Sequence, residues 1–214
     1  MWRFNLFGFP VAVHWTFWLV AVLLGSGFVG DSAQARFVLV VWVAVVFLSI
    51  MVHELGHAFM MRKQGDRSVQ IVLHSMGGYA QGTAWRSRRE QILVSAAGPV
   101  AQMALGAVAW LLLKLGLVPI LFYPVVALNL LIWVSFVWAI FNLLPIIPMD
   151  GGRIMEAVMG VRSSRLPLQI SLACASAIAL WQLTDGRLFN ALIVGSMAVE
   201  NYRALKGLPP ITRL

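Results

Sequence analysis

Long hydrophobic runs separated by short polar segments dominate this chain, and such runs predict helices that cross a membrane. We expect about six spans, with approximate limits at Val11 to Phe28, Phe37 to Met61, Gln91 to Leu113, Leu121 to Leu144, Leu166 to Leu183 and Leu188 to Met197. A helix needs about 20 apolar residues to cross the hydrocarbon core, so the last span is short. The pattern indicates an all-α polytopic membrane protein.

The polar segment 62–90 has a different pattern. Ser68 to Leu73 alternates partly between apolar and polar residues, and Gly77-Gly78 and Tyr79 to Gly82 follow. This arrangement predicts a small β-hairpin or sheet. Its edge could pair with an extended substrate strand, or the hairpin could simply lie at the membrane interface. The sequence leaves both alternatives open.

Composition supports the membrane assignment. Of the 214 residues 60% are hydrophobic and only 11% are charged, which is typical of a protein in a lipid bilayer. The net charge of +8 raises the alternative of a nucleic-acid partner, but the basic residues fall between the hydrophobic runs and form no single face. We therefore expect no nucleic-acid partner. No polar stretch is long enough for a second domain, so residues 1–214 are expected to form one domain.

The basic residues also predict an orientation. With the N-terminus in the cytoplasm, all of the sixteen Lys and Arg residues except Arg36, Lys114 and Arg187 lie on the cytoplasmic side. Both termini of this multi-pass protein of the inner cell membrane are then cytoplasmic.

His53-Glu54-Leu55-Gly56-His57 lies near the end of the second span and carries the candidate chemistry. Residues four apart share one face of a helix, so His53 and His57 can both donate a ring nitrogen to one Zn²⁺. Glu54, beside them, is positioned to act as a general base on water. At 1.5 Å per residue, the two histidines lie roughly 7 to 14 Å below Arg62, which places the active site in the cytoplasmic half of the bilayer.

A hydrolytic zinc site usually has three protein ligands, so one more is required. The candidates are His14 in the first span, His74 in the polar segment and Asp150 after the fourth span. Topology favours Asp150, because the fourth span ends on the same side as the second and Pro145 and Pro148 break the helix there.

An early helix carries His-Glu-Leu-Gly-His, and a later helix ends in Asn142-Leu-Leu-Pro-Ile-Ile-Pro-Met-Asp-Gly-Gly152. Together these two motifs resemble the site-2 protease family of intramembrane zinc metalloproteases. The resemblance is to its compact bacterial members, similar to the sporulation pro-sigma-factor processing protease. Gly77-Gly78 and Ala96-Ala97-Gly98-Pro99, at the opening of the third span, extend the match over nearly the whole chain.

The resemblance implies one Zn²⁺ per chain bound by His53, His57 and Asp150, with Glu54 as catalytic base and Asn142 near the site. Asn142 is also a candidate hydrogen-bond donor to the developing oxyanion, with plain helix packing as its alternative. Gln102 departs from the family pattern, where Asn is expected after Ala-Gly-Pro, and we expect this departure to affect packing without touching the metal.

We therefore predict a zinc-dependent intramembrane endopeptidase that cleaves a transmembrane segment of a membrane protein. The alternative is a membrane zinc transporter that uses the same His-Glu-x-x-His helix. Compact family members often carry a nucleotide-sensing domain and others a PDZ domain, and the sequence shows neither.

Overall fold

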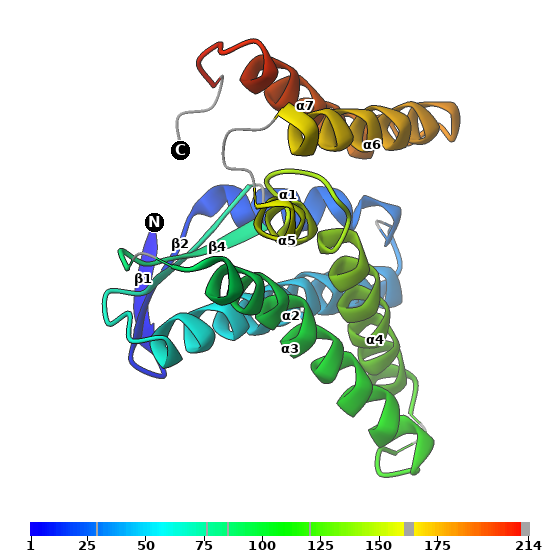
Figure 1. Cartoon of the computed structure of the whole chain (residues 1–214). Coiled ribbons are helices and arrows are strands. Elements are labelled where there is room, and N and C mark those ends of the chain that lie inside the picture. The colour runs from blue at the N-terminus through cyan, green and yellow to red at the C-terminus, as the bar shows by residue number, and fades with distance from the viewer. Residues whose placement is uncertain (29, 76, 85, 120, 161–164, 211–214) are drawn as a thin grey trace. The chain divides into compact units, whose positions relative to one another are not determined.

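The computed structural model describes all residues except 29, 76, 85, 120, 161–164 and 211–214, and it is mostly helical (Figure 1). The described residues form two units, which we treat separately. The first unit comprises Met1–Trp85 and Ala97–Phe141, and the second comprises Arg86–Ala96 and Asn142–Leu214.

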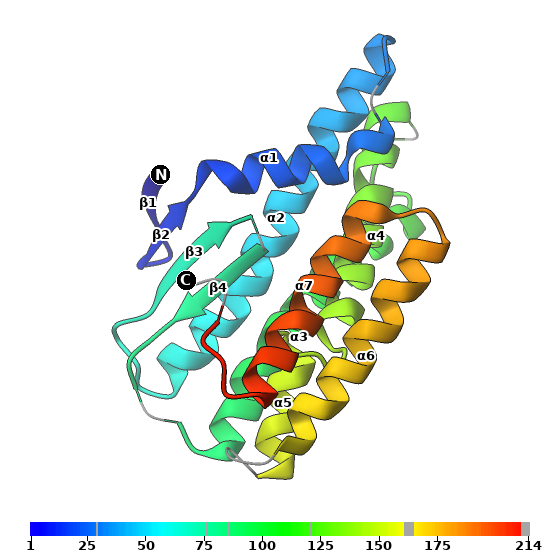
Figure 2. The ribbon, with the colours of Figure 1, turned by 90° about the horizontal axis from the view of Figure 1, so that it is seen from above.

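A four-stranded sheet with the order β1-β2-β3-β4 belongs to the first unit (Figure 2). Strands β1 (Trp2–Leu6) and β2 (Phe9–Val13) form an antiparallel hairpin, and β3 (Gln70–His74) and β4 (Gly77–Gln81) form a second one. Strands β2 and β3 are parallel and join the hairpins. The predicted hairpin in segment 62–90 is therefore confirmed.

The predicted first span, Val11 to Phe28, is wrong in its first part. Its initial residues belong to β2, and the helix that follows, α1 (Trp15–Leu24), has only 10 residues. At 1.5 Å per residue this helix is about 15 Å long, half the thickness of the hydrocarbon core. The apolar run hid the strand because apolar residues from a buried strand and a buried helix look alike over such a short distance.

One face of the sheet packs against the long helix α2 (Ala33–Lys63). Alternate residues of β2 and β3 are buried, and the ring of Phe9 lies 5.2 Å from that of Phe59 on α2. The Arg62 guanidinium stacks 3.5 Å from the Phe9 ring and donates hydrogen bonds to the carbonyl oxygens of Phe7 and Gly8. These contacts attach the β1–β2 turn to the end of α2.

The base of the β3–β4 hairpin is closed by a buried carboxylate. Asp66 accepts hydrogen bonds from the Ser68 backbone N–H and hydroxyl, at 3.0 and 2.7 Å, and from the Ala84 backbone N–H at 3.1 Å. Hydrogen bonds to a charged group are stronger than neutral ones, so Asp66 ties the two ends of the hairpin together.

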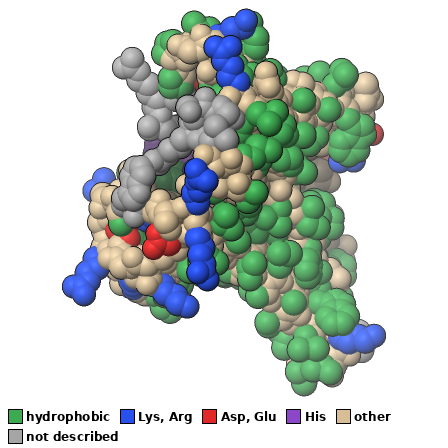
Figure 3. All heavy atoms as spheres, viewed as in Figure 1, with side chains coloured by type: hydrophobic (Ala, Val, Ile, Leu, Met, Phe, Trp, Pro, Cys, Tyr) green, Lys and Arg blue, Asp and Glu red, His purple; other side chains and the backbone are tan. Residues whose placement is uncertain are grey.

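Within the described part of the chain, four helices are long and apolar enough to cross a membrane: α2, α3 (Arg88–Lys114), α4 (Phe122–Asn142) and α6 (Arg165–Thr184). Side chains on α3 and α4 present a nearly continuous hydrophobic surface in Figure 3. Large apolar residues there, among them Val100, Trp110, Trp133 and Ile140, are more than half exposed. Such a surface is stable only against lipid or another apolar partner, which agrees with a multi-pass membrane protein.

The second unit contains the short helix α5 (Asp150–Met159) and a helical hairpin of α6 and α7 (Leu188–Leu205). The two helices of the hairpin run side by side in Figures 1 and 2. Helix α7 continues to Leu205, well beyond Met197, where the last predicted span ended, and its final turns contain polar residues that the hydrophobic pattern excluded.

Candidate metal centre

Helix α2 brings two ring nitrogens together inside the first unit. The Nε2 atoms of His53 and His57 lie 3.0 Å apart, and their rings are nearly perpendicular, with an interplanar angle of 80°. Both side chains are buried, at 5% and 7% exposure. The spacing of four residues therefore gives the predicted shared face, with both nitrogens directed at one region.

The separation of the two nitrogens fits a shared metal ion. Tetrahedral Zn²⁺ with Zn–N bonds of about 2.0–2.1 Å holds two nitrogens roughly 3.3 Å apart. The observed 3.0 Å is close to that value.

Gly98 on α3 provides the space beside these nitrogens. A Cβ atom built at Gly98 would lie 2.3 Å from His57 Nε2 and 2.8 Å from His53 Nε2, far closer than nonbonded atoms approach. The missing side chain therefore leaves room next to the ring nitrogens of both candidate ligands.

Gly56 explains how α3 comes so close to α2. A Cβ atom at Gly56 would lie 2.5 Å from the carbonyl oxygen of Ala97. The glycine inside His-Glu-Leu-Gly-His thus allows close contact between the two helix backbones, as small residues do at other membrane helix interfaces. The Ala-Gly-Pro segment lies within α3 instead of opening it, because the helix starts earlier, at Arg88.

Glu54 is 3% exposed and lies against β4. A Cβ atom at Gly78 would be 2.7 Å from both Cγ and Oε1 of Glu54. Strand β4 is the edge of the described sheet, so the carboxylate lies next to an edge strand.

Asp150 is the first residue of α5 in the second unit and is 7% exposed. The backbone before it is held by α6 and α7: the N–H of Ile147 donates to the Ser171 hydroxyl at 2.8 Å, and Asn201 Nδ2 donates to the carbonyl oxygen of Ile147 at 2.7 Å. A carboxylate at a helix N-terminus is stabilised in its charged form by the helix dipole. This supports a ligand role for Asp150.

The glycines after Asp150 allow the start of α5 to pack closely against the segment that precedes it. A Cβ atom at Gly151 would lie 2.1 Å from the Leu143 carbonyl oxygen, and one at Gly152 would lie 2.6 Å from that of Ile146. Both glycines therefore allow close packing between α5 and the segment before it.

The other candidate site residues have different positions. Asn142 is the last residue of α4 and is half-buried, and its role stays a prediction. His14 does not lie inside the first helix: it caps α1, and its Nδ1 lies 2.8 Å from the Thr16 hydroxyl. Neither His14 nor His74 belongs to a group of described residues that could hold a metal ion.

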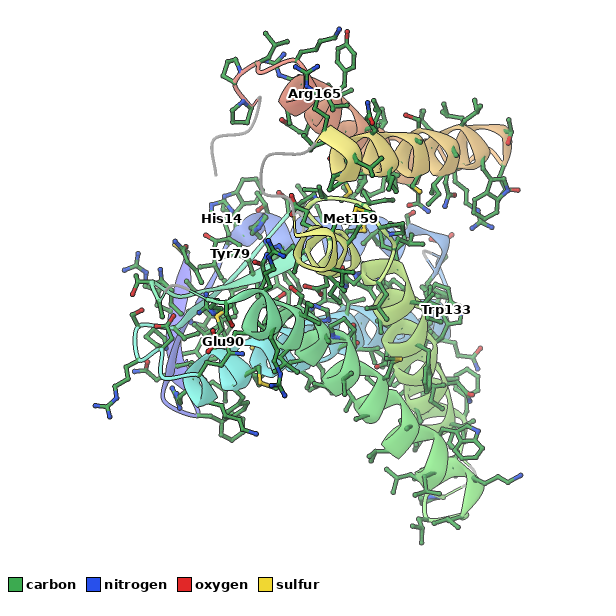
Figure 4. The ribbon with its side chains drawn as sticks, viewed as in Figure 1. His14, Tyr79, Glu90, Trp133, Met159 and Arg165 are labelled. Carbon is green, nitrogen blue, oxygen red and sulfur yellow. The ribbon has the colours of Figure 1, made fainter. Side chains whose placement is uncertain are left out.

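His74 is the last residue of β3, and its ring lies beside that of Tyr79, with centroids 5.4 Å apart and an interplanar angle of 59°. The pKa of His74 is lowered, mainly by burial and to a smaller extent by the charge of the neighbouring His14. The pairing of Val13 with Leu73 places the two histidines in adjacent register positions. In Figure 4 the labelled His14 and Tyr79 lie close to the same end of the sheet.

Gln102, whose departure from the family pattern was expected to affect packing without touching the metal, lies beside a candidate metal ligand. Its Oε1 lies 3.0 Å from Nδ1 of His53. The signal available in the sequence was its position four residues after Gly98, on the same face of α3.

These observations define the protein as a membrane protein with a buried His-Glu-x-x-His metal-binding helix. Comparison with known families gives a more specific result. Residues 32–149 match the model described as Peptidase M50B-like, and residues 123–181 match Peptidase family M50. The chain belongs to this family, the site-2 proteases.

Individual relatives agree with this assignment. The chain is similar to a zinc metalloprotease of Methanocaldococcus jannaschii, with 30% identity over 197 residues, covering 89% of this chain and 55% of the relative. It is also similar to stage IV sporulation protein FB of Bacillus subtilis, with 26% identity, covering 81% of this chain and 57% of the relative. The chain thus spans about half the length of these curated relatives.

A solved structure extends the likeness to the fold. The site-2 protease from Methanocaldococcus jannaschii superposes with a TM-score of 0.66 at 26% identity, covering 99% of this chain and 96% of that one. The predicted fold class, a helical membrane protein with a small sheet, is confirmed by this match. The predicted sheet was too small, because β1 and β2 were missed.

Proposed function

We propose that the protein is a zinc-dependent intramembrane endopeptidase that cleaves a transmembrane segment of another membrane protein. The observation that carries this proposal is the pair of Nε2 atoms of His53 and His57, 3.0 Å apart on a membrane-spanning helix and beside the space at Gly98. The family and the zinc metalloprotease among the relatives support it. They give no support to the transporter alternative.

In this proposal His53, His57 and Asp150 hold one Zn²⁺. All three side chains are buried, and each offers one ligand atom, a ring nitrogen from each histidine and a carboxylate oxygen from Asp150. The donor set of two imidazoles and one carboxylate is one that zinc uses in hydrolytic enzymes. When bound, Zn²⁺ polarises a carbonyl group and lowers the pKa of water to about 7.

Glu54 acts as the general base and then as the general acid. Its carboxylate follows His53 directly on α2 and is buried, so it can accept a proton from water and later deliver it to the leaving amine nitrogen. Asn142 is the proposed donor to the oxyanion, from the end of α4.

The substrate is proposed to bind as an extended strand next to β4. A peptide bond within a transmembrane helix is shielded by helical hydrogen bonds and must be unwound before it can be cleaved. The edge of β4 offers backbone groups for strand addition, and Gly78 on that strand lies against Glu54. A strand paired there would bring its backbone close to the general base.

This binding mode predicts that helix-breaking residues in the substrate accelerate cleavage. Each Gly costs a helix about 1 kcal/mol relative to Ala, so two Gly in place of two Ala near the cleaved bond should raise kcat/KM roughly 30-fold. Cleavage of paired model substrates in proteoliposomes measures the effect. The control carries the same two Gly at the far end of the substrate helix, and equal rates for all three substrates would contradict the extended binding mode.

Replacement of Asp150 tests the ligand set. The Asp150→Ala variant should lose at least 100-fold in zinc affinity and all measurable cleavage, because two imidazoles alone hold zinc weakly. Competition with a zinc chelator measures the affinity. Asp31→Ala, at an exposed carboxylate before α2, is the control and should bind zinc normally. Unchanged affinity in Asp150→Ala would remove Asp150 from the ligand set.

The orientation of the chain is part of the same proposal. Both termini are placed in the cytoplasm and the metal site in the cytoplasmic half of the inner membrane, on the basis of the distribution of Lys and Arg. The whole of residues 1–214 is proposed to act as one protease domain.

A further inference from the structure

A chain of buried polar side chains starts at His53 and crosses three helices of the first unit. His53 Nδ1 lies 3.0 Å from Gln102 Oε1, Gln102 Nε2 donates to the Ser49 hydroxyl at 2.9 Å, and the hydroxyls of Ser49 and Ser135 lie 3.2 Å apart. Gln102, Ser49 and Ser135 are fully buried, at 0% exposure.

The orientation of the Gln102 amide gives this chain a defined direction. A buried amide must use both its oxygen and its nitrogen in hydrogen bonds, because an unsatisfied polar group costs about 1–3 kcal/mol. The Ser49 hydroxyl accepts from Gln102 Nε2, which leaves the amide oxygen facing His53. An amide oxygen can only accept, so Nδ1 of His53 must carry the proton.

A proton on Nδ1 leaves the lone pair of a neutral imidazole on Nε2. This is the nitrogen of His53 that lies 3.0 Å from Nε2 of His57 and beside the space at Gly98. The hydrogen bond from Nδ1 also restricts rotation of the ring. Metal-binding histidines commonly donate their second ring nitrogen in this way, and the partner fixes both tautomer and orientation.

We propose that Gln102 is a positioning residue for the metal centre: it holds His53 in the Nδ1-protonated tautomer, with Nε2 directed at the metal, while the Ser49 hydroxyl accepts from its amide nitrogen. The inference rests on the proposed zinc site and adds a residue that contacts neither metal nor substrate.

Three variants separate this role from simple packing. Gln102→Met has a similar size but offers no strong acceptor to His53. Gln102→Glu keeps an oxygen that accepts from Nδ1. Ser49→Ala leaves Gln102 in place and removes only the group that orients its amide. Zinc affinity is measured by chelator competition, and the visible absorption of the Co²⁺-substituted protein reports the ligand geometry.

We expect Gln102→Met to weaken zinc binding 10- to 100-fold and to alter the Co²⁺ spectrum, in line with the loss of other partners of metal-binding histidines. Gln102→Glu should stay within a few-fold of the wild type, and Ser49→Ala should fall between the two. A packing role predicts the opposite order, because Met is tolerated in an apolar core whereas a buried Glu is costly.

Wild-type affinity in Gln102→Met, or weaker binding in Gln102→Glu than in Gln102→Met, would overturn the inference. If Gln102→Met does not fold, Ser49→Ala decides, since unchanged zinc affinity and an unchanged Co²⁺ spectrum in that variant would refute the role of the chain. A wild-type protein that binds no zinc would instead refute the proposed function. Zinc binding and cleavage that are normal in both wild type and Gln102→Met would refute the positioning role alone.

Discussion

We expect Glu54→Gln to abolish cleavage while zinc stays at about one ion per chain. The substitution preserves the size of the side chain and removes the carboxylate that accepts a proton. General acid–base groups contribute about 10²- to 10⁴-fold to rate, so the residual activity should lie at or below a hundredth of the wild type. Zinc should remain because the proposed ligand set of His53, His57 and Asp150 does not include Glu54.

The measurement pairs metal content with cleavage of a model transmembrane substrate by the same purified sample. Glu90→Gln is a suitable control, because it makes the same chemical change at a carboxylate that accepts from the Ser87 N–H and hydroxyl on the surface. Figure 4 shows Glu90 at the start of α3. Normal cleavage by Glu54→Gln would refute its role as base, and joint loss of zinc and cleavage would make it a ligand instead.

The second large effect is expected at Gly98. Addition of one methyl group in Gly98→Ala should weaken zinc binding by more than 100-fold and remove activity. The new Cβ would lie 2.3 Å from His57 Nε2 and 2.8 Å from His53 Nε2, so the imidazoles would have to turn away. Changes to partners of metal ligands cost 10- to 100-fold in affinity, and displacement of the ligands themselves should cost more.

Helix propensity cannot explain such a loss. Ala favours a helix by about 1 kcal/mol over Gly, so α3 itself should be stabilised by the substitution. Gly195→Ala on α7 is the matched control, because its nearest neighbour would be the Ala179 Cβ at 3.9 Å. Chelator competition gives the zinc affinity, and circular dichroism gives the helix content.

A double variant isolates the clash. If the ring of His57 is what the new methyl group meets, the thermal destabilisation caused by Gly98→Ala should largely disappear in the His57→Ala background. Equal destabilisation in both backgrounds would show that Gly98 matters for another reason, such as the approach of α3 to α2.

Several parts of the fold followed from the sequence because they depend on local pattern. The long apolar runs that became α2, α3, α4 and α6 exceed what any strand requires, so their type was unambiguous. Strand β2 was not recognised, because Phe9 to Val13 is an apolar run continuous with α1. Its strand conformation depends on pairing with β3, nearly sixty residues later, and no local pattern encodes that pairing.

The candidate metal site also divides into features set by local sequence and features set by tertiary contacts. The shared face of His53 and His57 followed from the sequence, because helix geometry alone brings residues four apart to one face. Gly98 and Gln102 were not assigned to the site, since their effect depends on how closely α3 approaches α2, which the packing of Gly56 against Ala97 decides. Ser171 and Asn201, which hold the backbone before Asp150, were missed because their contacts with Ile147 join segments distant in the sequence.

The sequence by itself determined that this is a helical membrane protein with a His-Glu-x-x-His metal motif, because hydrophobic length and helical periodicity are local properties of the chain. The tertiary structure alone decided the space at Gly98, the hydrogen bond from His53 to Gln102, and the contact of β4 with Glu54. These features arise between segments distant in the chain, where atomic packing fixes which side chains meet.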